Sequence, residues 1–84
     1  MRSGAAVRIS FYGRLVDVFG RNLELDLAAP CSIGELRERL QAMRSDQGLG
    51  DVRVRACVNG VFVSDSHIVR DGDAIEFLAP VSGG

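Results

Sequence analysis

Hydrophobic and polar residues alternate along several short stretches of this chain, a pattern typical of strands with one buried face. Residues 22–27 show it most clearly, because every second residue is a leucine. In the last stretch the alternation turns Ile75 and Phe77 inward. We predict strands at 7–12, 22–27, 52–58, 61–63 and 74–78.

A different spacing predicts the main helix. One apolar stripe recurs at three- and four-residue intervals, as on one face of a helix, and consists of Ile33, Leu36, Leu40 and Met43. Ser32 and Glu35 have the spacing of a capping box, in which each side chain bonds the backbone N–H of the other residue. Gly48 and Gly50 end the pattern, so we expect the helix to stop near Gln47.

Three turns complete the local picture. Apolar spacing over residues 15–19 predicts a single helical turn, which Gly20 closes. Asn59-Gly60 lies between two apolar runs and predicts a tight hairpin, because both residues tolerate a positive φ. Residues 71–73, Asp-Gly-Asp, predict another turn, and two carboxylates alone are too few ligands to indicate a cation site.

The order strand, strand, helix, strand, short strand, strand predicts an α+β fold with two layers. One main helix packs on one face of a mixed sheet. We expect a single domain over residues 1–84, with a frayed start at 1–5 and a mobile C-terminal tail at 80–84.

A single helix leaves the other face of the sheet uncovered. Tyr12, Phe62 and Leu78 fall at positions that include this second face. If they cluster there, they form a patch for a partner protein. Alternatively the register is off by one residue, which moves a side chain to the opposite face.

Charge and composition exclude several functions. All ten basic residues are arginine, and against 11 acidic residues the net charge is −1. No basic surplus is available to neutralise a nucleic-acid backbone, so we expect no nucleic-acid binding. No run of 18 apolar residues predicts a membrane span, and no signal-peptide pattern opens the chain. We therefore expect a cytoplasmic protein with both cysteines reduced.

Candidate catalytic groups are few. His67 is the one histidine and falls in a connecting segment, where an ordinary surface role is expected. Cys31 stands beside the predicted helix start, where the helix dipole favours a thiolate, but we expect no functional role for it. Cys57 falls within a strand and is expected to be packed. No set of these residues has metal-ligand spacing, so we predict no metal site.

The printed sequence closes on Gly83-Gly84. Glycine has no Cβ, so such a tail is thin enough to pass through a narrow slot. The α-carboxyl of Gly84 is unhindered, and a second protein could activate it there.

Taken together, these features resemble the ubiquitin-like sulfur carriers of bacteria, most closely the type that serves molybdopterin synthase. The resemblance extends from about Val7 to Gly84. It depends on Val58-Asn59-Gly60, Asp71-Gly72-Asp73 and the closing run from Ala79 to Gly84, and also on Phe11-Tyr12 followed by a helical turn that ends at Gly20. The family's β-grasp fold agrees with the predicted order of elements.

The resemblance implies a carrier subunit whose chemistry is completed in a partner, with no cofactor bound to the chain itself. An ATP-dependent activating enzyme adenylates the carboxyl of Gly84, and a sulfur donor protein converts it to a thiocarboxylate. The tail then enters the large subunit of molybdopterin synthase and delivers sulfur to a cyclic pterin precursor.

The resemblance also assigns roles along the tail. Gly84 carries sulfur and Gly83 lets the tail pass. Ser82 stands where threonine is frequent, and Pro80 and Val81 direct the tail off the sheet.

For partner contact the expected residues are Tyr12, Phe62 and Leu78. Many relatives have arginine at the position of Val16, so Arg14 either substitutes for it in docking or the contact differs.

Two alternatives remain. The chain could carry sulfur for thiamine thiazole or cysteine synthesis, although the turn over residues 15–20 argues against the thiazole type. It could also be a β-grasp binding module that uses its sheet and never its C-terminus.

Overall fold

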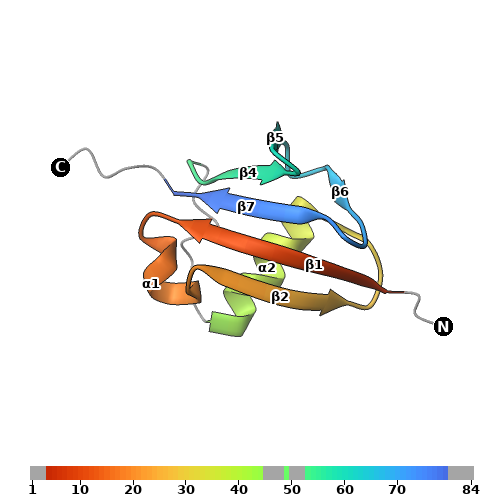
Figure 1. The fold of residues 1–84 in the computed structure, drawn as a ribbon, viewed down its shortest axis with the longest axis horizontal. Helices are drawn as coiled ribbons and strands as arrows, with labels where there is room; N and C mark the ends of the chain where they lie inside the picture. Colours follow the sequence, from red (N-terminus) through yellow and green to blue (C-terminus); the bar gives the residue numbers. More distant parts are fainter. Residues whose placement is uncertain (1–3, 45–48, 50–52, 80–84) are drawn as a thin grey trace.

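The computed structural model describes residues 4–44, 49 and 53–79. The elements follow in the order β1 (Ala5–Tyr12), α1 (Leu15–Phe19), β2 (Asn22–Leu27), β3 (Cys31–Ser32), α2 (Ile33–Arg44), β4 (Arg55–Val58), β5 (Val61–Val63), β6 (Ile68–Val69) and β7 (Ala74–Leu78). The two layers predicted from the sequence are present: Figure 1 shows α2 behind a sheet that faces the viewer.

The main sheet has five strands in the order β2-β1-β7-β4-β5. β1 and β7 pair in parallel, and the other three pairs are antiparallel. The first and last strands of the chain therefore lie side by side at the centre of the sheet (Figure 1). This arrangement confirms the predicted α+β class, the mixed sheet and the main helix on one face.

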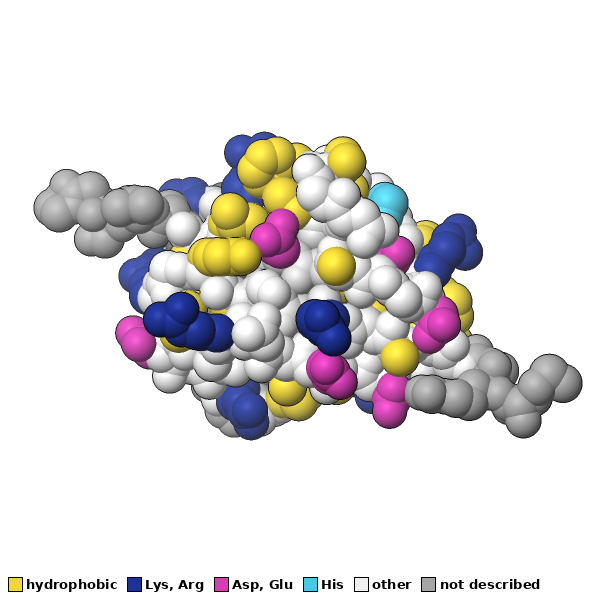
Figure 2. All heavy atoms as spheres, viewed as in Figure 1, with side chains coloured by type: hydrophobic (Ala, Val, Ile, Leu, Met, Phe, Trp, Pro, Cys, Tyr) yellow, Lys and Arg dark blue, Asp and Glu magenta, His cyan; other side chains and the backbone are white. Residues whose placement is uncertain are grey.

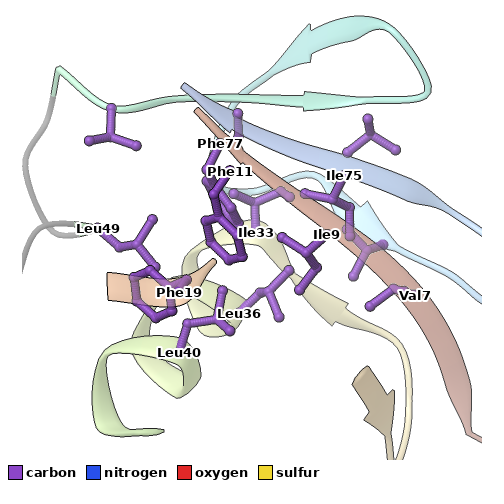
Figure 3. Packing of buried hydrophobic residues seen from close by; sticks show 14 of the residues in the cluster. Val7, Ile9, Phe11, Phe19, Ile33, Leu36, Leu40, Leu49, Ile75 and Phe77 are labelled. Atoms are coloured by element: carbon purple, nitrogen blue, oxygen red, sulfur yellow. The ribbon is translucent and has the colours of Figure 1, made fainter. Parts of the chain in front are cut away.

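The core lies between the sheet and α2 (Figure 3). Phe11 of β1 stacks on Phe19 of α1 at 4.7 Å between ring centroids and on Phe77 of β7 at 6.1 Å. Leu36 and Leu40 of α2 are fully buried beneath these rings. The aromatic stack joins α1 and the two central strands, so it stabilises the region where both strands end.

Helix α2 begins where the sequence predicts. The Ser32 hydroxyl accepts a hydrogen bond from the Glu35 N–H at 3.1 Å, and Glu35 Oε1 accepts one from the Ser32 N–H at 2.9 Å. This reciprocal pair is the predicted capping box. The expected apolar stripe is confirmed except at Met43, in the last turn of α2, which is 43% exposed. The expected end near Gln47 lies outside the described residues.

Three further expectations need correction. Ala5 is not frayed, because it opens β1 opposite Leu27 and is fully buried. The described part of the strand expected at 52–58 begins at Arg55, later than predicted. The sequence pattern did not predict β3 and β6, which pair with each other as a two-stranded sheet. Two-residue strands are too short to show any periodicity.

The hairpin and turn predictions are confirmed. Asn59 has φ of 52° and Gly60 has φ of 86°, which are the left-handed conformations that the β4–β5 hairpin needs. Gly72 also has φ of 86° in the turn between β6 and β7. Within the described ranges, no helix is long and apolar enough to cross a membrane.

Candidate functional site

The parallel pairing of β1 with β7 determines where the C-terminal segment begins. Tyr12 and Leu78, the last residues of these strands, are register partners. Ala79 follows Leu78 and lies against the β1–α1 turn, since a Cβ placed on Gly13 would be 3.3 Å from the Ala79 Cβ. Residues 80–84, which include the expected sulfur carrier Gly84 and the tail residues Pro80, Val81, Ser82 and Gly83, lie outside the described residues.

The face of the sheet opposite α2, here called the open face, carries the three aromatic and aliphatic residues expected to contact a partner. The register aligns Tyr12, Leu78 and Arg55 in one row across the sheet. The neighbouring row holds Ser10, Glu76, Cys57 and Phe62. Because residues in these rows share a face, Tyr12, Leu78 and Phe62 lie on the open face together, as one of the two sequence interpretations predicts.

These residues form an apolar surface beside the point where β7 ends. Tyr12 is 45% exposed, Phe62 is 57% exposed and Leu78 is half-buried. Figure 2 shows hydrophobic side chains gathered on this face over β4, β5 and the ends of β1 and β7. Exposed apolar side chains gathered on one face of a small domain are typical of a protein-binding surface.

Two charged residues of this surface were not found by sequence reasoning. The Arg55 guanidinium lies 5.0 Å from the centre of the Phe62 ring, a cation–π contact across β4 and β5. The Tyr12 hydroxyl donates a 2.8 Å hydrogen bond to Glu76 Oε2. Both contacts join neighbouring strands. Predicting them from the sequence requires knowing which strands pair and in which register.

The Tyr12–Glu76 hydrogen bond affects the acidity of the phenol. The pKa of Tyr12 is raised, first because its proton is shared with the Glu76 carboxylate and then because a phenolate would stand beside that negative charge. The phenol therefore stays protonated as a hydrogen-bond donor at neutral pH.

Arg14, the other residue expected to contact a partner, precedes α1 and is exposed two residues after Tyr12. Its expected role in docking stays a prediction.

The cysteines and histidine show no catalytic arrangement. Burial raises the pKa of the Cys31 thiol, and the charge of Glu35 raises it further, so this position beside the helix start does not favour a thiolate. Burial also raises the pKa of Cys57, which is packed as predicted. His67 is exposed, and its backbone carbonyl accepts a hydrogen bond from the Ile33 N–H. No group of three potential metal ligands occurs in the described ranges.

The aspartates of the β6–β7 turn have structural roles. Asp71 Oδ1 accepts a hydrogen bond from the Ala6 N–H at 2.8 Å. Asp73 accepts hydrogen bonds from the Arg70 N–H at 2.8 Å and from the Asn59 side-chain amide at 3.1 Å. These bonds confirm the turn interpretation, because both carboxylates are occupied in holding the turn.

The domain consists of a five-stranded mixed sheet packed on one main helix, and the first and last strands of the chain, β1 and β7, pair in parallel. This arrangement defines a ubiquitin-like β-grasp domain. Residues 9–84 match the model of the ThiS family. The chain therefore belongs to the ThiS family.

Similar proteins agree with this assignment. The chain is 30% identical over 81 residues to the molybdopterin synthase sulfur carrier subunit of Escherichia coli (strain K12), an alignment that covers 93% of this chain and 99% of that protein. A solved complex of subunits 1 and 2 of the molybdopterin-converting factor from Helicobacter pylori contains a chain with 26% identity and a TM-score of 0.61, with 94% and 99% of the two chains covered.

The fold is also that of a putative molybdopterin converting factor subunit 1 from Pyrococcus furiosus. That structure has a TM-score of 0.76 and 23% identity, with 92% of this chain and 99% of the other covered.

Proposed function

We propose that this chain is the sulfur carrier subunit of a molybdopterin synthase and acts in molybdenum cofactor biosynthesis. The observation that carries the proposal is the parallel β1–β7 pair, which starts the C-terminal segment beside the apolar open face. A partner that covers this face would receive the tail in a fixed position. Family membership and the similarity to the E. coli carrier subunit support the same role.

The proposed chemistry takes place at the α-carboxyl of Gly84. An activating enzyme joins this carboxylate to the α-phosphorus of ATP, and pyrophosphate leaves. A donor of sulfur at the oxidation level of sulfide then adds to the acyl carbon, and AMP leaves with the bonding electron pair. The product is a thiocarboxylate, a soft nucleophile that the docked domain holds near its target.

The other tail residues give access to this group. Gly83 and Gly84 have no side chains to block a narrow channel. The fixed φ of a proline at position 80 would direct the tail off the sheet. The large synthase subunit is the proposed receiver, and the H. pylori complex of subunits 1 and 2 supports a partner of this kind. In this proposal the chain carries the sulfur, and the reaction is completed in the large subunit.

The intact mass of the protein tests the proposal. The chain is incubated with its activating enzyme, ATP and a sulfide source, and we expect the mass gained by exchanging one oxygen for sulfur. Deletion of Gly84, or one residue added after it, removes that gain because the reactive carboxyl is displaced or becomes an amide. No gain, with an activating enzyme that is active on another carrier, would support a binding module instead.

The receiving pathway is tested separately. Thiocarboxylated protein is mixed with the large synthase subunit and the cyclic pterin precursor, and we expect sulfur to be lost from the carrier as dithiolene forms. Phe62→Arg places a charge on the open face, so we expect weaker binding to the large subunit with an unchanged fold. Thiocarboxylate formation without transfer to the pterin would indicate a carrier for another pathway.

A further inference from the structure

Glu76 lies within the apolar part of the open face. It stands between Ser10 of β1 and Cys57 of β4 in the register of the central strands, and Cys57 is in turn opposite Phe62. Its side chain is already half-buried in the uncomplexed protein. A partner that covers Tyr12, Leu78 and Phe62 therefore also covers this carboxylate.

The carboxylate has few donors within the chain. Among the residues that the structure describes, Tyr12 is the one side chain that donates to it, through a single hydrogen bond to Oε2. An ionised carboxylate has about four acceptor positions on its two oxygens. The remaining positions are open to water while the face is exposed.

Two arginines of this face are engaged elsewhere. Arg55 stacks on the ring of Phe62, and Arg8 forms a 3.5 Å ion pair with Glu24 towards the β2 edge. Neither forms an ion pair with Glu76. Covering the open face with apolar groups alone would thus remove water from a carboxylate that holds only one hydrogen bond, which is strongly unfavourable.

We propose that the protein that docks on the open face presents an arginine or lysine side chain to Glu76, and that Tyr12 positions the carboxylate for this ion pair. The inference rests on the proposed function, because the proposed function identifies the docking protein as the large subunit of molybdopterin synthase. The apolar residues around Glu76 would exclude water from the pair. A partner without a matching cation would bind poorly, so Glu76 determines specificity.

The direction in which one substitution changes the binding affinity tests this inference. Affinity for the large synthase subunit of the same organism is measured by calorimetry for the unaltered chain and for Glu76→Ala. A buried ion pair predicts weaker binding by about 30-fold or more, since the partner's cation loses its counter-charge in a dry interface. If the partner is apolar at this point, the same substitution removes a desolvation cost and tightens binding, which would overturn the inference.

Matched variants separate charge from structure. Glu24→Ala removes the same charge from the same face at an exposed ion pair, and we expect affinity within about twofold of the unaltered chain. Tyr12→Phe keeps the ring and the Glu76 carboxylate, so we expect a loss of only about three- to tenfold. If Tyr12→Phe and Glu76→Ala lost the same amount of affinity, the loss would be explained by a changed orientation of Tyr12 rather than by the charge of Glu76. That result would overturn the inference.

Charge reversal completes the test. Glu76→Arg brings two cations together and is expected to abolish measurable binding, whereas binding that survives would contradict the proposal. Thermal unfolding of each variant confirms that the fold is intact. If the unaltered chain also fails to bind the large subunit, the proposed function fails and this inference fails with it.

Discussion

The side-chain amide of Asn59 donates a 3.1 Å hydrogen bond to Asp73 Oδ1, which joins the β4–β5 hairpin to the turn before β7. The Asn59 side-chain oxygen in turn accepts a hydrogen bond from the Ala74 N–H at 3.0 Å. Two motifs that are distant in the sequence thus form one network, at the end of β7 opposite the C-terminal segment. The network gives these motifs a structural role, separate from the open face.

Substitution of Asn59 tests this network. Asn59→Gly keeps the positive φ of 52° but loses both side-chain hydrogen bonds, so we expect unfolding free energy to fall by about 1–2 kcal/mol. Asn59→Ala adds the strain of a left-handed alanine, about 1 kcal/mol more. Chemical denaturation measures both losses.

A control for Asn59 is available in an exposed loop. Ser64→Ala removes a hydroxyl that pairs with Ser66 at 2.9 Å in an exposed segment, and we expect a change within about 0.5 kcal/mol. Equal stability of Asn59→Gly and the unaltered chain would refute a structural role for the network.

The ionisation of Tyr12 on the open face can be measured directly by absorbance, because the chain has one tyrosine and no tryptophan. Its pKa is raised by the Glu76 carboxylate, so we expect Glu76→Gln to lower the pKa towards the ordinary tyrosine value of about 10. Ultraviolet absorbance of the tyrosinate during an alkaline titration gives the pKa without interference. An unchanged titration in Glu76→Gln would show that the hydrogen bond is absent in solution.

The same bond has a consequence for stability in alkali. A raised folded-state pKa means that the folded protein holds the proton more tightly than the unfolded chain. The stabilisation is fully present below the unfolded pKa and is lost as the pH rises through the folded pKa. We expect Tyr12→Phe to show a smaller loss of stability across this alkaline range, measured by denaturation at several pH values.

The capping box of α2 predicts an effect at acid pH. Two hydrogen bonds from Ser32, first from its backbone N–H, lower the pKa of Glu35. The stabilisation is therefore present above the ordinary glutamate pKa of about 4.3 and is lost as the pH falls through the lowered value. We expect Glu35→Gln to flatten the decline of stability in this acidic range.

Loss of the serine cap is expected to have a measurable cost at neutral pH. Ser32→Ala leaves the Glu35 N–H without its acceptor, and we expect the unfolding free energy to fall by about 1 kcal/mol. Denaturant titration of Ser32→Ala and Ser32→Thr compares loss of the cap with its retention. Similar losses in the two variants would indicate that the hydroxyl is not what stabilises the helix.

Arg37 holds three segments together from α2. Its guanidinium donates to the backbone carbonyls of Leu49 at 2.9 Å and Val54 at 2.8 Å, and to the Asp65 carboxylate at 2.9 Å. The side chain is only 12% exposed and lies 5.3 Å from the centre of the Phe77 ring. We expect Arg37→Met to cost about 2–3 kcal/mol in thermal or chemical unfolding, because both carbonyls lose their donor.

The partner of Arg37 provides the comparison. Asp65 is 62% exposed, so Asp65→Asn removes only a solvent-screened charge and is expected to cost less than about 1 kcal/mol. If Asp65→Asn and Arg37→Met were equally destabilising, the ion pair rather than the carbonyl contacts would be the source of the stability.

Local patterns anticipated most of the elements for identifiable reasons. Alternation in β1, β2 and β7 follows directly from the pleat, and the capping box and Asn59-Gly60 act within a few residues of one another. The predictions were wrong where a contact with a distant segment decides the outcome, as in the β3–β6 pair. Ala5 is ordered because β2 pairs with it, which no property of the first five residues reveals.

The residues of the candidate site likewise fall into those that the sequence predicted and those that only the structure revealed. Tyr12, Phe62 and Leu78 were found from alternation, because one helix cannot cover both faces of a sheet. Glu76 and Arg55 were missed, since a charged residue in a strand ordinarily faces water and its neighbours depend on strand order.

The sequence alone thus determined the main helix, most of the strands, the turns, the uncovered face and the family resemblance, because each depends on spacing within a short segment. Only the tertiary structure decided that β1 and β7 are parallel neighbours, so that Tyr12 meets Glu76 and the last strand ends beside the open face. It also decided which backbone carbonyls Arg37 reaches. The physical reason is that these contacts form between residues far apart in the chain, and their partners are selected by the packing of the whole sheet on α2.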